Sequence, residues 1–220
     1  MAARDHQPAP RGYTMRARKQ SVDQTRLRIT AAAMRLHERI GPGATTVSAI
    51  ADEAGVTRLT VYRHFPDDES IVRACSGHWR ALHPEPDPAA WAAIDDPLQR
   101  LRVALSDTYT WAHRAEPMMS KIYRDLHLMP AFVTEALGQE QESRVATLTQ
   151  GFRAPDRKSQ LLRAALAHAV DFRTWYSLCV LGGLREDEAI ELMLATVAAA
   201  VQTPATAPSG SSLPAPPIQE

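Results

Sequence analysis

Residues 46–65, TVSAIADEAGVTRLTVYRHF, contain the pattern that decides the fold of the N-terminal part of the chain. Ala51 is small enough for two short helices to approach closely, and Gly55, four residues later, suits a left-handed turn between them. Val61 follows ten residues after Ala51 and is placed to face inward from the second helix. These offsets predict a helix-turn-helix, although an ordinary antiparallel helix pair in a helical domain also fits them.

The outward face of the second helix indicates what this motif contacts. No carboxylate occurs from Thr57 to Phe65, whereas a solvated face usually mixes both signs of charge. Hydroxyl and basic groups match the phosphates and base edges of DNA, with Arg58 and Thr60 better placed to read bases and Thr57, Tyr62 and His64 to hold phosphates. The predicted DNA-binding residues are Thr46, Thr57, Arg58, Thr60, Tyr62, Arg63 and His64.

The run of residues 25–72 resembles the DNA-binding domain of the TetR family of regulators. The resemblance rests on Ala32-Ala33, Leu36, Gly41, Thr46-Val47, Ile50-Ala51, Ala54-Gly55-Val56, Thr60, Tyr62 and His64-Phe65. It implies binding to double-stranded operator DNA, a homodimer formed through the last two helices as a four-helix bundle, and a small-molecule ligand held in a helical domain. The expected protein is a repressor that this unidentified ligand releases from its operator.

Two positions depart from the family pattern. Leu59 stands where the family usually has a small residue, and Asp68 stands where it usually has a lysine that meets a phosphate. Asp67 and Asp68 are well placed to cap the next helix, which is a sufficient structural reason for their presence. No phosphate contact is therefore expected at position 68. We hypothesise that the basic residues Arg16, Arg18 and Lys19 compensate for the DNA affinity lost with that lysine.

The rest of the chain is predicted to be all-α, with about nine helices. A flexible basic arm (1–21) precedes a three-helix helix-turn-helix DNA-binding domain (22–82), whose first helix spans about 23–40. A helical effector-binding and dimerisation domain (83–202) follows, and a disordered Pro-rich tail (203–220) ends the chain. Within 83–202 we expect a Pro-rich linker (83–95), a helix opened by Asp96-Pro97 and three further helices opened by Pro117, Pro130 and Pro155. The last of these three is long (156–181), and a final helix (185–201) follows it.

Composition and charge limit the alternatives. The net charge is zero, but residues 1–83 hold 13 basic against 8 acidic side chains and the remainder hold 12 against 17, a pattern typical of a chain in which one part meets phosphate. No run of about 18 apolar residues and no secretory signal occurs, so neither a membrane span nor export is expected. Only Cys75 and Cys179 are present, which fits a reducing cytoplasm.

Large adaptable side chains that follow the linker, three of them within the long helix, form the predicted effector site, although each of them also fits a core role. They are Tyr109, Trp111, His113, Met118, Met119, Ile122, Tyr123, Met129, Phe132, Phe172, Trp175 and Tyr176, with polar contacts available from His113, Arg124, His127, His168 and Asp171. A metal site from His127, His168 and Asp171 lacks diagnostic spacing, so we expect neither a metal nor a cofactor.

Other functions remain open at this point. The sequence shows no Ser-His-Asp spacing, no Gly-rich phosphate loop and no His-Glu-x-x-His motif, so an enzyme is not expected. An activator with the same DNA-binding head and a DNA-organising protein without an effector are alternatives. For a repressor, a ligand that prefers the dimer geometry mismatched to two half-sites must weaken DNA binding, with the 96–113 helix moving against the helix at about 67–82.

Overall fold

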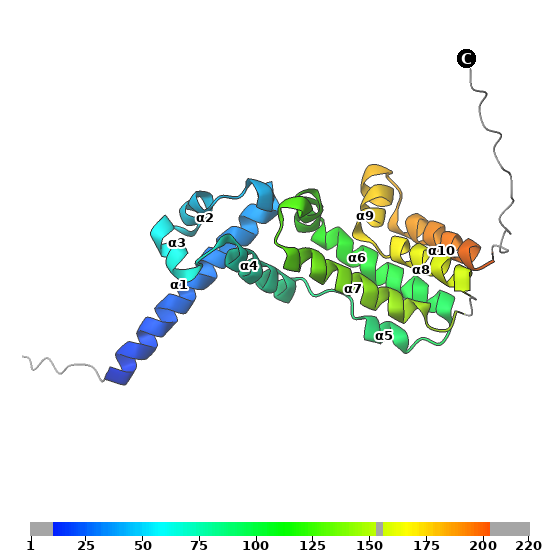
Figure 1. Cartoon of the computed structure of the whole chain (residues 1–220), viewed down its shortest axis with the longest axis horizontal. Helices are drawn as coiled ribbons and strands as arrows, with labels where there is room; N and C mark the ends of the chain where they lie inside the picture. Colours follow the sequence, from blue (N-terminus) through cyan, green and yellow to red (C-terminus); the bar gives the residue numbers. More distant parts are fainter. Residues whose placement is uncertain (1–10, 153–155, 203–220) are drawn as a thin grey trace, which may run out of the picture. The chain divides into compact units, whose positions relative to one another are not determined.

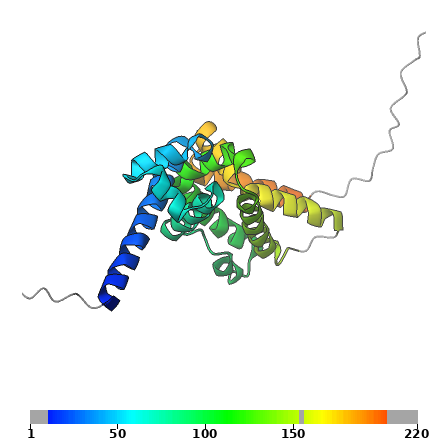
Figure 2. The same ribbon diagram turned by 60° about the vertical axis from the view of Figure 1, so that its left-hand side comes forward.

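The computed structural model describes residues 11–152 and 156–202, which form two compact units (Figures 1 and 2). The first unit takes in the chain up to residue 86 together with residues 110–140, and the second takes in residues 87–109 and the chain from residue 141. Every regular element within these described ranges is helical, and none of the described helices is long and apolar enough to cross a membrane. The predicted all-α fold is confirmed.

The first unit is built around a core shared by its first four helices. They are α1 (Arg11–Ile40), α2 (Val47–Ala54), α3 (Arg58–His64) and α4 (Asp68–Leu82), with the short 3-10 turn η1 (Pro42–Ala44) after α1. The buried side chains of this core are Ile29, Ala32, Ala33, Leu36, Ile50, Ala51, Ala54, Val61, Phe65, Ile71 and Cys75. The end of α6 (Pro97–Arg124), the 3-10 turn η2 (Leu126–Leu128) and the start of α7 (Ala131–Thr149) complete the unit.

The second unit contains α5 (Pro88–Ala92), the first part of α6, the rest of α7, α8 (Asp156–Ala169), α9 (Phe172–Trp175), the π-helical segment η3 (Tyr176–Leu181) and α10 (Glu186–Gln202). Helices α8 and α10 pack along each other. The buried Arg100 binds main-chain carbonyls at helix ends, donating from Nε to Ile94 O (2.9 Å) and from Nη1 to Gln150 O (2.5 Å). The Tyr109 hydroxyl donates to Ala169 O at 3.0 Å, which ties α6 to the end of α8.

The first helix is longer than the sequence predicted. It begins at Arg11 rather than near Asp23, and both views show it extending as a straight rod beyond α2 and α3 (Figures 1 and 2). Residues 15–28 lack Pro and Gly, so nothing interrupts the backbone hydrogen bonds that continue the helix outward from the core. The arm's residues 1–10 and the predicted tail, 203–220, lie outside the described residues.

Two helix boundaries predicted from proline and periodicity are wrong. Pro117 lies inside α6 rather than opening a helix, because buried residues on both sides of it, Ala115, Met118 and Met119, hold the helix in place despite the missing N–H. The long helix predicted over 156–181 is interrupted after Ala169, where Asp171 accepts a hydrogen bond from Arg173 N (2.7 Å) and starts α9.

Other boundaries agree with the prediction or add to it. Asp96 accepts from Leu98 N (2.9 Å) ahead of Pro97, α7 begins directly after Pro130, and the last helix differs from its prediction by one residue at each end. Pro155 lies outside the described residues. The linker contains an unpredicted short helix, α5, because Asp87 caps it by accepting from Ala89 N at 2.9 Å.

Candidate functional site

The turn between α2 and α3 has the geometry that the sequence predicted. Gly55 adopts the left-handed conformation with φ of 64°, and the next amide, Val56 N, donates to Ala51 O at 2.9 Å. Ala51 is 2% exposed, so a larger side chain there would separate the two helices. This turn therefore holds α3 against α2 and leaves one side of α3 outside the core.

Threonines begin both helices of the motif. Thr46 Oγ1 accepts a hydrogen bond from Ala49 N at 3.1 Å, and Thr57 Oγ1 accepts from Thr60 N at 3.2 Å. Both side chains satisfy amides that a helix start leaves without intrahelical partners. The hydroxyls of Thr57 and Thr60 also lie 2.9 Å apart, so Thr60 is engaged inside the motif as well as being half-buried.

One residue of α3 is buried and four face solvent. Val61 is completely buried, and Phe65, directly after the helix, is also completely buried. The exposed residues are Arg58, Leu59, Tyr62 and Arg63, which we call the α3 outer face. This face carries two guanidinium groups, one phenol and one aliphatic side chain, and no acid.

Contacts from α1 fix the C-terminal end of α3. Arg26 Nη1 donates to His64 O at 2.5 Å, and the Arg26 guanidinium lies 4.1 Å from the centre of the Phe65 ring. The half-buried His64 is thereby placed beside α1. The C-terminal end of α3 is therefore attached to α1 by Arg26.

A groove beside α3 gathers three of the predicted DNA-binding residues. Its volume is about 540 Å³, and Thr46, Arg58 and Tyr62 line it together with Asp68. Asp67 caps α4 by accepting from Ser70 N at 2.7 Å, which confirms the capping role predicted for it, while Asp68 is exposed. A carboxylate at the groove repels phosphate, so position 68 offers no anion contact.

The projecting part of α1 adds positive charge to the same unit. Arg18 and Lys19 have exposed side chains on the part of α1 that precedes the core residue Ile29. Nothing in the sequence analysis indicated that these residues belong to a helix, because no apolar stripe accompanies them. A continuous helix holds their charges at a fixed spacing.

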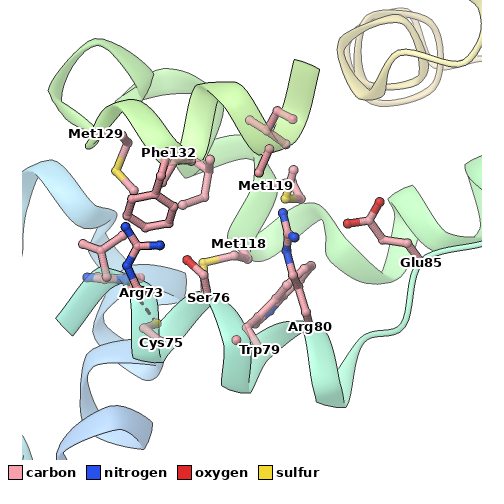
Figure 3. A pocket seen from close by; sticks show the side chains of 17 residues that line it. Arg73, Cys75, Ser76, Trp79, Arg80, Glu85, Met118, Met119, Met129 and Phe132 are labelled. Carbon is pink, nitrogen blue, oxygen red and sulfur yellow. Dashed lines mark hydrogen bonds between the residues drawn. The ribbon is translucent and has the colours of Figure 1, made fainter. Parts of the chain in front are cut away.

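A second candidate site is a cavity of about 260 Å³ in the first unit (Figure 3). Five of the predicted effector residues line it: Met118, Met119, Ile122, Met129 and Phe132. The opposite wall comes from α4 and includes Arg73, Ser76, Trp79 and Arg80, which Figure 3 shows beneath the methionines. The sequence analysis missed this wall, although residues 72, 76 and 80 recur at the spacing of one helix face.

The charged groups at this cavity are compensated by neighbours. Arg73 pairs with Glu69 at 2.7 Å, and its guanidinium lies 4.0 Å from the centre of the Phe132 ring. Arg80 pairs with Glu140 at 2.6 Å. The remaining lining is mostly apolar, so the cavity suits a small apolar ligand close to the lower end of the roughly 300–1,000 Å³ typical of ligand sites.

The other predicted effector residues lie elsewhere. Tyr109 is buried, and burial raises the pKa of its hydroxyl; Trp111 Nε1 donates to His83 O at 3.3 Å, His113 is exposed and Tyr123 is half-buried. Phe172, Trp175 and Tyr176 form an aromatic cluster with ring centres 5.5–6.5 Å apart. None of these residues lines the cavity.

The predicted polar contacts have structural partners. Asp171 caps α9, and His168 Nδ1 lies 3.2 Å from the Thr174 hydroxyl; His127 is exposed. Arg124 Nη2 donates to Ile40 O at 2.9 Å, and its neighbour Asp125 accepts from Gly43 N at 2.9 Å. Arg124 is also the main reason that the pKa of Asp125 lies below its ordinary value. Among the described residues, no three acidic, His or Cys side chains are grouped to hold a metal.

Between the groove and the cavity lies a buried pair, His37 and Cys75, with Nδ1 and Sγ 3.4 Å apart. Burial lowers the pKa of His37 to about 4 against a weaker opposing effect of Asp125, and raises the pKa of the Cys75 thiol to about 12. Both side chains are therefore neutral near pH 7 and serve as part of the core.

Comparison with known proteins agrees with this geometry. Residues 29–75, which span the core part of α1 through the first half of α4, match the family model described as bacterial regulatory proteins, tetR family. This part of the chain is a DNA-binding domain of the TetR type. The match supports a DNA-binding regulator of the helix-turn-helix type.

Solved structures of other regulators share the fold. A tetR-family transcriptional regulator from Streptomyces coelicolor has 18% identity and a TM-score of 0.58, covering 81% of this chain and 80% of its own. NalD, the secondary repressor of the MexAB-OprM multidrug efflux pump in Pseudomonas aeruginosa, has 19% identity and a TM-score of 0.54, covering 82% and 97%. No curated protein matches the sequence.

Proposed function

We propose that this TetR-family regulator is a homodimeric repressor that inserts α3 into the major groove and leaves its operator when a small apolar molecule binds. The observation that carries the proposal is the α3 outer face, which is exposed, basic and free of acids on a buried support. We assign base reading to Arg58 and phosphate contacts to Thr46 and Tyr62, which line the same groove. Arg63, Thr57 and His64 complete the contact surface.

The surroundings of Thr60 change the role that we assign to it. Thr60 was predicted to read bases, but its hydroxyl lies against that of Thr57 and its side chain is half-buried. We therefore assign Thr60 to positioning Thr57 and the helix start. Base reading then falls mainly to Arg58 on the α3 outer face.

Dimerisation is proposed through the C-terminal helices. Large aliphatic side chains are exposed on α8 (Leu161, 47%), on η3 (Leu181, 73%) and on α10 (Leu192, 45%). Burial of such groups against a second copy removes apolar surface from water. The double substitution Leu161→Glu and Leu192→Glu is expected to give monomers in sedimentation velocity, and an unchanged dimer would contradict this assignment.

The cavity between α4, α6 and α7 is the proposed effector site. Trp79 lines this cavity and also joins α4 to α6. Its ring packs edge to face against that of Trp111, with the ring centres 6.2 Å apart. A ligand that separates these walls shifts α4, which packs on α1 in the core that supports α3. Ligand binding can therefore weaken DNA binding by moving α6 against α4.

Two measurements test the proposal. Selection from random duplexes is expected to enrich two half-sites centred about 34 Å apart or more, as symmetric dimers require, and no enrichment would contradict DNA binding. A screen of small apolar metabolites by fluorescence anisotropy is expected to find compounds that release the operator. Met119→Trp should retain DNA affinity and lose this release, whereas the exposed-site control Leu98→Trp should keep both; equal release from Met119→Trp would exclude this cavity.

The proposed site of action is the cytoplasm. Both cysteines are free of disulfides in the structure, as is usual in a reducing compartment.

A further inference from the structure

The α3 outer face contains one side chain that neither phosphate nor a polar base edge explains. Leu59 is 69% exposed, although it lies in a short helix whose other outward residues are Arg58, Tyr62 and Arg63. The core below α3 is already filled by Val61 and Phe65, both completely buried. Leu59 therefore contributes little to packing in the free protein and leaves most of its apolar surface in water.

Its position decides which partner meets it. Leu59 precedes Arg63 by one helical turn and shares its face of α3, and Arg58, the side chain assigned to base reading, lies with Tyr62 on the adjoining face. A helix that places Arg58 against base edges brings Leu59 into the same groove. Thr57, which caps α3, and Thr60 lie on the neighbouring side, and their hydroxyls form a hydrogen bond with each other.

The major groove offers one apolar group, the C5-methyl of thymine. Every other base edge there presents donors or acceptors, and an aliphatic side chain satisfies none of them. We infer that Leu59 determines specificity by packing against a thymine methyl in each half-site. The inference rests on the proposed DNA binding through α3 and adds a base identity to it.

The size of the effect follows from the burial of one methyl group. Removal of a buried methyl-sized group from an apolar contact corresponds to roughly a fourfold loss of affinity for one half-site. Because a symmetric dimer makes the contact twice, the loss is about 15-fold when both half-sites are changed. Effects of this size are measurable by anisotropy titration.

Deoxyuridine supplies the test, because it pairs as thymine does and lacks only the methyl. The operator is first selected from random duplexes with the full chain, and each thymine of the half-site is then replaced in turn. We expect one position at which the unsubstituted protein loses about fourfold per half-site, while Leu59→Ala binds the thymine and deoxyuridine operators equally. Leu82→Ala removes another exposed leucine, at the end of α4 (55% exposed), and should keep the full thymine dependence.

The outcomes separate the inference from the function beneath it. Failure to enrich any operator would overturn DNA binding and this inference together. An operator insensitive to deoxyuridine at every thymine, or equally sensitive with Leu59→Ala, would overturn the role of Leu59 alone. Urea unfolding of Leu59→Ala is expected to match that of the unsubstituted protein, because the side chain is exposed, and this control ties any lost sensitivity to the contact itself.

Discussion

Acid is expected to destabilise the first unit through His37. This side chain is 5% exposed and lies beside Cys75, and burial lowers its pKa from 6.5 to about 4. The folded state therefore holds the neutral imidazole, whereas the unfolded chain takes up a proton below about pH 6.5. The stability that depends on this difference is complete above pH 6.5 and is lost as the pH falls from 6.5 toward 4.

The magnitude follows from the two pKa values. At about 1.4 kcal/mol per pKa unit the full loss is about 3 kcal/mol, of which about 2 kcal/mol falls between pH 7 and pH 5. Asp125, which opposes the shift, has a pKa below its ordinary value of 3.8 and stays ionised through this window. Its own stabilising contribution is therefore lost only at lower pH.

The assay is urea unfolding followed by tryptophan fluorescence at pH 7 and pH 5, at one protein concentration. The free energy of unfolding of the unsubstituted protein should fall by about 2 kcal/mol more than that of His37→Gln, which does not titrate. The exposed His113→Gln is the matched control and should retain the full pH dependence. Equal pH dependence in His37→Gln and in the unsubstituted protein would refute the assignment to His37.

Two further changes test the turn after α1 and the helical arm. Gly41 has φ of 91° and lies against the side chains of Arg124 and Asp125, so Gly41→Ala should lower the free energy of unfolding by about 1–3 kcal/mol; no loss in urea titrations would contradict this strain. Deletion of residues 1–20 removes Arg18 and Lys19 and should weaken operator binding while reducing the slope of log affinity against log salt by roughly 0.9 per lost phosphate contact. An unchanged affinity and slope would show that the arm does not contact DNA.

The DNA-binding motif was predictable because its constraints are local. The residue types at Ala51, Gly55 and Val61 are set by the close approach of two helices across one turn. The same turn geometry requires the same residue types in any protein. Thr46, Thr57 and Asp67 each cap a helix by accepting a hydrogen bond from the amide three residues later, so these caps could also be predicted from the sequence. The same local rules failed at Pro117, where burial of the neighbouring residues overrides the usual effect of a proline inside a helix.

The residues around the proposed effector cavity were only partly predictable because they depend on which helix faces which. The methionines and Phe132 were identified by type, but composition does not say that Tyr109 and Phe172 belong to a different compact unit. The wall formed by α4 was hidden, since Trp79 and Arg80 gave no signal beyond helical periodicity. Long-range packing of this kind arises from shape matching among several elements, which one stretch of sequence does not encode.

The most direct test of the account is the affinity of Arg58→Ala for the selected operator, compared with that of Arg114→Ala, an exposed arginine on α6. A base-reading arginine is worth about 1–3 kcal/mol, so Arg58→Ala should lose about 5- to 150-fold and tolerate more bases at one operator position. Arg114→Ala should bind as the unsubstituted protein does. Equal affinity and unchanged base preference in Arg58→Ala would contradict the claim that α3 reads DNA.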